Sequence, residues 1–290
     1  MKIILSSNPY RDRGLRVAQE SQRILRAAGA DTVICIPFTP KKGERVELPR
    51  NVAVSVLEKE LPKADLLICF GGDGTILHAA RDATLHDVPI LGVNMGSVGF
   101  MAELERSELQ MLTALAKGKF TTEARMMLDV RVFRGDKLIS QDLALNDAVV
   151  SKGSMARVAE LEVLADNVQV TAVHGDGVII STPTGSTAYS MSAGGPIVEP
   201  TSSSLIITPV CAHQLAARAM VLAPERIITV RLPRANRKYL YLSVDGGKAV
   251  RLAGGDRVEI NRSTRSTKLV KLTNRSFYHL ISHKLGGATL

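Results

Sequence analysis

One acidic side chain lies inside a glycine-rich turn, Gly71-Gly72-Asp73-Gly74-Thr75. The turn joins an apolar run to a helical pattern, so its N–H groups begin a helix and favour a phosphate. Glycines let a ligand approach the backbone closely, but a carboxylate is a poor phosphate ligand. Asp73 therefore suits another task, such as accepting the proton of a hydroxyl or holding a metal ion. The turn predicts phosphoryl transfer to an alcohol, and the alternative is a strand-to-helix turn in which Asp73 only caps the helix.

Four polar clusters in the second half of the chain extend this prediction. Asn146-Asp147 can hold the hydroxyl or amino groups of a nucleoside, although such a pair is usually a turn. Gly175-Asp176-Gly177 leads into an apolar run. The stretch from Ser181 to Pro196 is dense in hydroxyl groups and small residues, which suits a sugar or a nucleotide, with an ordinary loop as the alternative. Val244-Asp245-Gly246-Gly247 is either a hairpin turn or a turn that presents a carboxylate.

The first 120 residues predict the elements that would position Asp73. Apolar runs alternate with helical patterns, which indicates a parallel sheet covered by helices on both faces. In such sheets, ligands bind beyond the carboxyl ends of the strands. The Asp73 turn and a second glycine-rich loop, Asn94 to Phe100, each follow a predicted strand, so one rim of the sheet would carry both. The expected strands are 2–6, 32–36, 66–70 and 89–93, and the expected helices are 13–28, 75–85 and a short one after Ser107.

Beyond residue 120 the sequence changes to short runs in which apolar and polar residues alternate, such as 128–133 and 258–260. This period of two indicates antiparallel strands in a β-rich, sandwich-like domain. The segment from Phe277 to Leu285 predicts a helix whose apolar residues need a partner. The sequence thus predicts a Rossmann-like α/β domain over residues 1–120, a β-rich domain over 121–276, and a C-terminal segment, 277–290, that packs back on the first domain.

Composition narrows the class of protein. A net charge of +9 suits an anionic partner, but aromatic residues are only 4% and tryptophan is absent, which disfavours stacking on nucleic acid. Basic residues alternate with apolar ones, a pattern typical of the solvated face of a strand, so no nucleic-acid partner is expected. The chain has no apolar run long enough for a membrane span, and its histidines lack metal-ligand spacing. Cys35, Cys69 and Cys211 are expected to be buried thiols of a cytoplasmic protein.

Taken in order, five motifs resemble those of bacterial NAD kinases: Gly71 to Thr75, Asn94 to Phe100, Leu145-Asn146-Asp147, Asp176-Gly177 and Ser181 to Pro196. The glycine motif also occurs in phosphofructokinases and in diacylglycerol and sphingosine kinases, but its combination with the hydroxyl-rich stretch is specific. The resemblance covers nearly the whole chain. It implies phosphorylation by ATP of the 2′-hydroxyl on the adenosine ribose of NAD, giving NADP. It also implies an NAD site between the two domains, a Mg²⁺ or Mn²⁺ ion carried by the ATP phosphates, and a homodimer or homotetramer.

The resemblance also assigns roles to single residues. Asp73 would be the general base near the 2′-hydroxyl, and Phe100 would pack near the adenine. The phosphates would be bordered by Gly71, Gly72, Gly74 and Thr75, and the other NAD-binding positions would be Asn146, Asp147, His174, Asp176, Thr184, Thr187, Ala188, Tyr189, Ser192 and Asp245.

Two positions depart from the family pattern. Asp147 stands where the family usually has Glu, so its carboxylate is one methylene shorter. His174 stands where many bacterial members have Arg, so a neutral imidazole replaces a fixed positive charge near the NAD phosphates. Two other classes of protein are weighed against the NAD kinase. The intact Asp73 turn argues against a nucleotide-binding module without turnover, and the hydroxyl-rich stretch argues against a diacylglycerol-type lipid kinase.

Overall fold

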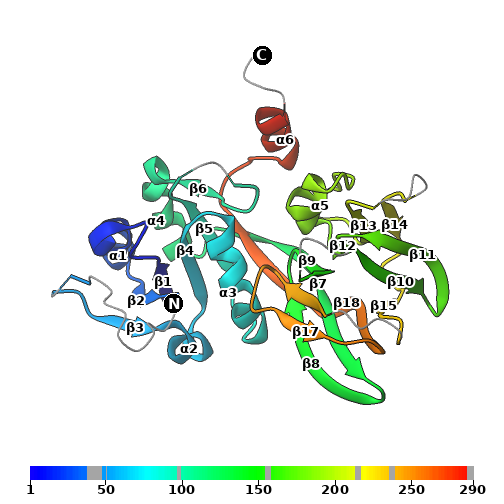
Figure 1. Cartoon of the computed structure of the whole chain (residues 1–290). Coiled ribbons are helices and arrows are strands. Elements are labelled where there is room, and N and C mark those ends of the chain that lie inside the picture. Colours follow the sequence, from blue (N-terminus) through cyan, green and yellow to red (C-terminus); the bar gives the residue numbers. More distant parts are fainter. Residues whose placement is uncertain are drawn as a thin grey trace. The chain divides into compact units, whose positions relative to one another are not determined.

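The structure, a computed structural model, describes residues 1–37, 48–49, 51–96, 99–153, 158–212, 217–234 and 239–285. Ser97 and Val98 of the second glycine-rich loop lie outside these ranges. The chain forms two compact units, one of residues 1–124 with 267–290 and the other of residues 125–266. Figure 1 follows the chain through both. The domain boundaries drawn from the sequence at residues 120 and 276 stay predictions.

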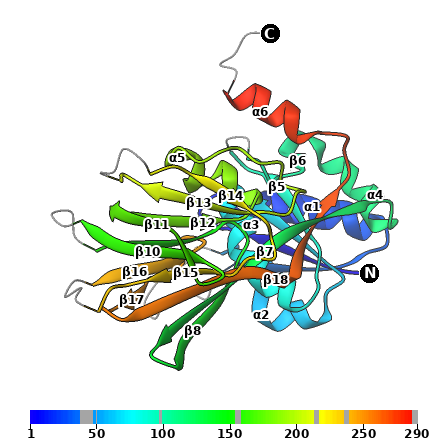
Figure 2. The ribbon, with the colours of Figure 1, turned by 90° about the vertical axis from the view of Figure 1, so that its right-hand side faces the viewer.

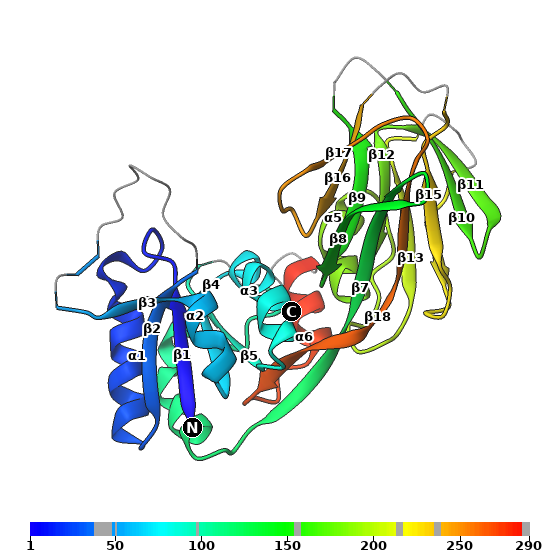
Figure 3. The ribbon, with the colours of Figure 1, turned by 90° about the horizontal axis from the view of Figure 1, so that it is seen from below.

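The first unit is built on a parallel sheet with the strand order β18-β5-β4-β1-β2-β3, and β6 lies beside β5. Strand β4 pairs in parallel with both β1 and β5. Helices α1 and α4 share a core with the strands, and Figure 3 shows α1 alongside β1 and β2. The predicted parallel α/β sheet is confirmed. Its elements are β1 Lys2–Ser7, α1 Arg16–Ala27, β2 Asp31–Ile36, β3 Val54–Val56, α2 Leu57–Glu60, β4 Leu66–Gly71, α3 Asp73–Leu85, β5 Ile90–Asn94, β6 Leu104–Glu105, α4 Leu112–Ala116 and α6 Phe277–Leu285.

The second unit contains two antiparallel sheets. One has the order β14-β13-β12-β9-β16-β17, and the other joins β11, β10, β15 and β18, with β7 paired to β18 and to β8. Inward-facing side chains of both sheets form one core, so the predicted antiparallel sandwich is confirmed (Figure 2). Its elements are β7 Thr121–Arg134, β8 Lys137–Ala144, β9 Asp147–Lys152, β10 Ala159–Ala165, β11 Val168–Gly175, β12 Gly177–Ser181, α5 Tyr189–Ser192, β13 Leu205–Val210, β14 Met220–Leu222, β15 Ile228–Arg231, β16 Leu240–Val244, β17 Val250–Leu252 and β18 Asp256–Lys271.

Two strands are much longer than the sequence indicated. β7 has 14 residues and β18 has 16, whereas alternation pointed to 128–133 and 258–260. The additional residues are largely polar and partly exposed, so they carry no regular hydrophobic period. The end of β18 belongs to the first unit, where Leu269 pairs in parallel with Ile90 of β5. From there the chain continues to α6 (Figure 1).

The cysteines are free thiols, two of them buried. Burial raises the pKa of both Cys35 and Cys69 to about 12, so neither is a nucleophile near neutral pH. Cys211 is exposed, contrary to the prediction, because it lies just beyond the end of β13 with a positive φ of 45°. None of the described helices is long and apolar enough to span a bilayer.

Candidate active site

Asp73 is the first residue of α3, directly beyond the carboxyl end of β4. The residue at the N-cap position is Gly72, and no side chain caps this helix. The carboxylate of Asp73 instead accepts hydrogen bonds from the backbone N–H of Phe100 at 2.7 Å and of Met101 at 3.0 Å. The alternative in which Asp73 only caps the helix is therefore wrong. Backbone groups 27 and 28 residues away orient its carboxylate.

The glycines around Asp73 serve different purposes. A Cβ atom at Gly71 would lie 2.0 Å from Thr75 Oγ1, and one at Gly99 would lie 2.0 Å from Asp73 Oδ1, so packing requires glycine at both positions. At Gly72 and Gly74, a Cβ atom would meet nothing within 4 Å. The φ of Gly72 is −99°, which any residue adopts. Neither the backbone nor the neighbours explain these two glycines, and the open space beside them is where a ligand can approach the backbone.

The second glycine-rich loop begins on the same rim of the sheet, as predicted. Gly71 and Asn94 are register partners at the ends of β4 and β5, and Met95 N–H donates to the Gly71 carbonyl at 3.1 Å. The Asn94 side chain donates to the Glu105 carboxylate at 3.0 Å and accepts from Gly96 N–H at 3.1 Å. These bonds fix the start of the loop that returns to Asp73.

Phe100 lies against the C-terminal helix. Its ring centroid is 6.4 Å from that of Phe277, and Lys284 Nζ lies 4.2 Å from the Phe100 ring centroid. The predicted contact of Phe100 with adenine is not tested by this arrangement, which shows the ring held by α6.

Asp245 is the second carboxylate that backbone groups hold. It accepts hydrogen bonds from the N–H of Leu145 at 2.7 Å, Asn146 at 2.8 Å and Asp147 at 3.0 Å. Asp245 and Gly246 have φ of 49° and 68°, and Gly247 N–H closes the turn on the carbonyl of Val244 at 2.8 Å. This geometry is a type I′ hairpin turn. The turn is thus a hairpin whose carboxylate is held by backbone N–H groups, and the alternative in which this carboxylate faces a ligand stays a prediction.

Asp147 is 5% exposed, and its carboxyl group is close enough to Asp245 for an electrostatic interaction with that carboxylate. Burial, and then the charge of Asp245, raises the pKa of Asp147 to about 7. Burial also raises the pKa of Asp245, but its three N–H donors favour the ionised form and oppose that rise. Because Asp147 lacks this set of donors, we assign the proton of the pair to Asp147.

The hydroxyl-rich stretch packs on the chain before β9. Thr182 Oγ1 donates to the carbonyl of Leu145 at 2.5 Å and accepts from Gly185 N–H at 3.0 Å. A Cβ atom at Gly185 would lie 2.1 Å from the carbonyl oxygen of Asn146. The ordinary-loop alternative does not account for two other atoms: Asn146 Oδ1 and Ser181 Oγ are buried and have no hydrogen-bond partner among the described residues.

The predicted residues of this stretch differ in exposure. Thr184 is 5% exposed, and its carbonyl accepts from Thr187 Oγ1 at 3.2 Å. Ala188 is partly buried, whereas Tyr189 and Ser192 on α5 are exposed.

Asp176 lies between β11 and β12, and His174 lies near the end of β11, which belongs to the other sheet. Strand β12 pairs Ser181 with Asp147 at one end and Gly177 with Ser151 at the other, so Asp176 is roughly 15 Å along the strand from Asp147. The carboxylate of Asp176 pairs with Lys152 Nζ at 2.6 Å. His174 is exposed. The structure therefore groups Asn146, Asp147 and Asp245 together but places these two residues apart from them.

Sequence reasoning missed several residues beside the predicted site. Arg125 is 7% exposed, and its Nη1 donates to Thr184 Oγ1 at 3.4 Å, so a guanidinium group is buried under the hydroxyl-rich stretch. Lys152 was also missed, whereas Gly99 belongs to the second glycine-rich loop that the sequence singled out. An arginine or lysine on a strand looks like a solvated residue in a sequence, and no local pattern distinguishes Arg125 from the others.

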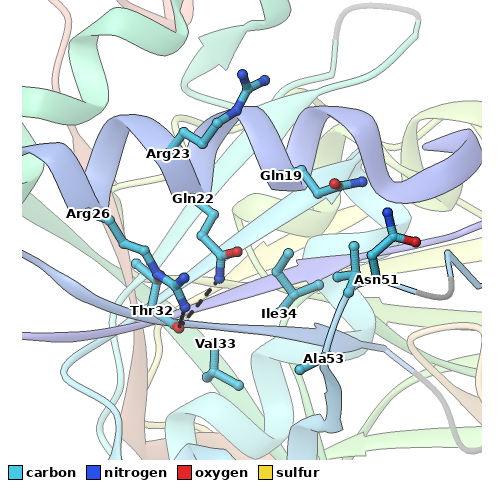
Figure 4. A pocket seen from close by; sticks show the side chains of 10 residues that line it. Gln19, Gln22, Arg23, Arg26, Thr32, Val33, Ile34, Asn51 and Ala53 are labelled. Atoms are coloured by element: carbon cyan, nitrogen blue, oxygen red, sulfur yellow. Dashed lines mark hydrogen bonds between the residues drawn. The ribbon is translucent and has the colours of Figure 1, made fainter.

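A separate pocket of about 360 Å³ lies between α1 and β2 (Figure 4). Arg26 Nη2 and Gln22 Nε2 donate to the carbonyl of Thr32 at its edge, at 3.1 and 3.5 Å. None of the predicted site residues lines it. The lining residues are Gln19, Gln22, Arg23, Arg26, Thr32, Val33, Ile34, Asn51, Val52 and Ala53.

In the described parts of the chain, no group of three or more His, Cys, Asp or Glu side chains is placed to hold a metal ion. The carboxylates of Asp73 and Asp245 are instead occupied in part by N–H donors. A carboxylate that already accepts backbone N–H groups is better suited to accept from a hydroxyl or amino group of a ligand than to enclose a cation.

Comparison with known proteins agrees with this geometry. Residues 3–120 match the family model described as ATP-NAD kinase N-terminal domain, and residues 145–272 match ATP-NAD kinase C-terminal domain. An NAD kinase of Ruminiclostridium cellulolyticum is 35% identical over 98% of this chain and 97% of its own length. Yeast NADH kinase complexed with NADH has a similar fold, with a TM-score of 0.84, 24% identity and coverage of 100% of this chain and 89% of that chain.

An NAD kinase from Archaeoglobus fulgidus in complex with ATP also shares the fold, with a TM-score of 0.73, 23% identity and full coverage of both chains. Because both family models match in chain order and the 35% identity extends over almost the whole length, the chain belongs to the NAD kinase family.

Proposed function

We infer that the protein transfers the γ-phosphoryl group of ATP to the adenosine ribose 2′-hydroxyl of NAD and so produces NADP. Family membership supports the reaction. The observation that carries the mechanism is the Asp73 turn. A carboxylate oriented by two N–H donors lies between two glycines whose missing side chains leave open space. The comparisons lend no support to a lipid kinase or to a module without turnover.

Asp73 is the general base in this proposal. Its two oxygens offer about four lone-pair directions, of which the N–H groups of Phe100 and Met101 use two. The remaining directions can accept the 2′-hydroxyl proton while the hydroxyl oxygen attacks the γ-phosphorus, the bond from that phosphorus to the β–γ bridging oxygen breaks, and ADP leaves. Gly71, Gly72, Gly74 and Thr75 border the phosphates, where the N-terminus of α3 favours negative charge.

The second unit supplies groups for the dinucleotide. The buried atoms Asn146 Oδ1 and Ser181 Oγ have no partner in the described chain, and together with the proton on Asp147 they can bind hydroxyl or amino groups of a nucleoside. The other NAD-binding positions are those expected from the family, namely Phe100, His174, Asp176, Thr184, Thr187, Ala188, Tyr189, Ser192 and Asp245.

A divalent cation, Mg²⁺ or Mn²⁺, would be carried by the ATP phosphates and would neutralise part of their charge. The cytoplasmic location and the homodimer or homotetramer are proposals from the family resemblance. Light scattering coupled to size-exclusion chromatography measures the oligomer.

The reaction is tested by incubating the protein with Mg-ATP and NAD and measuring NADP with an NADP-specific dehydrogenase. The Asp73→Asn variant is expected to lower kcat by about 10²–10⁴-fold, because the amide cannot accept the proton. Asp82→Asn, on the same helix α3, is the matched control and is expected to retain native turnover. Near-native turnover of Asp73→Asn would refute the base assignment, and an inactive native protein would refute the reaction.

A further inference from the structure

The C-terminal helix α6 is tied to the loop that orients Asp73. We propose that Phe277 and Glu103 are positioning residues for phosphoryl transfer, acting through Phe100 on the Asp73 carboxylate. The inference rests on the proposed role of Asp73 as the base and adds residues that do not themselves touch the reacting groups.

The first step is the dependence of Asp73 on residues 99–101. The Phe100 and Met101 N–H groups both donate to its carboxylate. At Gly99 the backbone passes so close that a Cβ atom would lie 2.0 Å from Asp73 Oδ1. A small displacement of this segment therefore changes the direction of the carboxylate lone pairs.

The second step is the contact of Phe100 with α6. The Phe100 and Phe277 rings meet at an interplanar angle of 47°, and Lys284 Nζ lies 4.2 Å from the centre of the Phe100 ring. Both contacts are within the first unit. The side chain that anchors this segment is thus held by a helix almost 180 residues further along the chain.

The third step is the anchoring of α6 itself. The helix has nine residues, and helices of this length are marginal in isolation. The strand end that precedes it is held by Glu103, which is 3% exposed. The Glu103 carboxylate accepts from the N–H groups of Leu272 at 2.9 Å and Thr273 at 2.6 Å, and it pairs with Lys271 Nζ.

Arg275 completes this attachment. Its Nη1 donates to the Glu103 carbonyl at 3.0 Å, and its Nη2 pairs with Glu108 Oε1 at 2.6 Å. Glu103 is only three residues beyond Phe100. One segment, residues 99–108, therefore carries the donors to Asp73 and also holds the chain that leads into α6. The two attachments connect the donors to Asp73 with α6 both through the Phe100 ring and through Glu103.

The test is a double-mutant cycle between Phe277→Ala and Asp73→Asn, with kcat and both KM values measured by NADP formation. In the native background, Phe277→Ala is expected to lower kcat about tenfold, since small misplacements of a catalytic group have effects of this order. The KM for ATP should change less than twofold, whereas the KM for NAD is not a control, because Phe100 is itself a proposed NAD-binding position. In the Asp73→Asn background, Phe277→Ala should change kcat less than twofold, because the base through which it acts is already removed.

Two variants of α6 serve as controls. Phe277→Tyr keeps the ring and should retain native kcat, and His283→Ala, at an exposed position of the same helix, should also retain it. Hydrogen exchange at the Phe100 and Met101 amides should become faster in Phe277→Ala and stay native in His283→Ala. If Phe277→Ala does not fold, Glu103→Gln replaces it in the same cycle.

The outcomes separate this inference from the proposed function. An unchanged kcat for Phe277→Ala, or the same loss in both backgrounds, overturns the positioning role while Asp73 remains the base. Near-native turnover of Asp73→Asn alone overturns the base assignment and the positioning role with it.

Discussion

Each unit contains a turn in which an aspartate is next to glycine, and the two turns use their residues differently. In the first unit Asp73 has helical backbone geometry, and Gly72 and Gly74 border open space. In the second unit Asp245 and Gly246 both have left-handed φ values. The chain itself requires glycine at Gly246, because a side chain there is strained. The glycines beside Asp73 have no such structural requirement, which points to a ligand.

The carboxylates differ as well, although backbone N–H groups hold both. Asp245 accepts from the N–H groups of three consecutive residues and is partly exposed. Asp73 accepts from two N–H groups and is partly exposed. Asp245 also has a second carboxylate, Asp147, close by. Asp245 thus has one more backbone donor than Asp73, so its removal is expected to cost the fold more stability.

The largest effect on stability is expected for Asp245→Ala. This change leaves the N–H groups of residues 145–147 without their acceptor. It also places alanine, whose side chain has no polar group, at a positive φ. We expect the free energy of unfolding to fall by about 3 kcal/mol, since each unpaired buried donor costs roughly 1–3 kcal/mol and water replaces part of the loss. Urea denaturation measures it.

Asp245→Asn is the matched control, because its amide oxygen retains one acceptor and asparagine tolerates a positive φ. It should lose less than half as much stability as Asp245→Ala. Equal stability of the native protein and Asp245→Ala would show that this carboxylate does not support the fold.

Asp147→Asn is expected to have an effect that depends on pH. The folded pKa of about 7 lies above the ordinary value of about 3.9, so the folded protein binds this proton more tightly than the unfolded chain. Stability therefore falls as pH rises from about 4, and the loss is complete above about 7. Asparagine does not ionise, so the variant should be more stable than the native protein at pH 8 and nearly equal to it at pH 4.

We expect a gain of about 2 kcal/mol at pH 8, because one pKa unit corresponds to about 1.4 kcal/mol and relaxation around the ionised group reduces the total. Thermal unfolding across pH 4–8 measures the difference. A stability difference that does not change with pH would contradict the assignment of the proton to Asp147.

The smallest change in stability is expected for Gly74→Ala, and it should be opposite in sign to that of Gly246→Ala. Alanine favours a helix, so Gly74→Ala should stabilise by about 0.5 kcal/mol. Gly246→Ala, at φ 68°, should destabilise by about 1 kcal/mol. Gly74→Ala should nevertheless lower kcat/KM for ATP at least tenfold, because its methyl group fills space proposed for the phosphates.

Thermal unfolding and NADP formation measure these two effects. Native kcat/KM for ATP in Gly74→Ala would mean that the phosphates do not approach this turn. Destabilisation by the same change would mean that the chain itself requires the glycine.

Much of the fold could be predicted from the sequence, because local patterns specify it. The apolar run that ends at Gly71 became β4, and the helical pattern after it became α3. The period of two beyond residue 120 became the antiparallel sandwich. The long polar parts of β7 and β18 were not predicted, because strands exposed on one side beyond the core carry no regular apolar alternation.

The candidate site was predicted less completely. The residue types in the two acid-and-glycine turns were sufficient to single out Asp73 and Asp245. The sequence contained no signal for Arg125 beneath Thr184, since it acts through a contact with a distant part of the chain, and it pointed to the loop of Gly99 but not to its contact with Asp73. It also did not show that Asp176 lies far from Asp147 along β12.

The sequence by itself determined the family and the element types, and it singled out Asp73 and Asp245 as candidates, because these depend on residue type and short spacing. Only the tertiary structure decided which groups hold those carboxylates: residues 100 and 101 for Asp73, and residues 145–147 for Asp245. The donors are backbone N–H groups, which nearly every residue carries. Their identity is therefore set by how the chain folds back on itself and not by the side chains that a sequence displays.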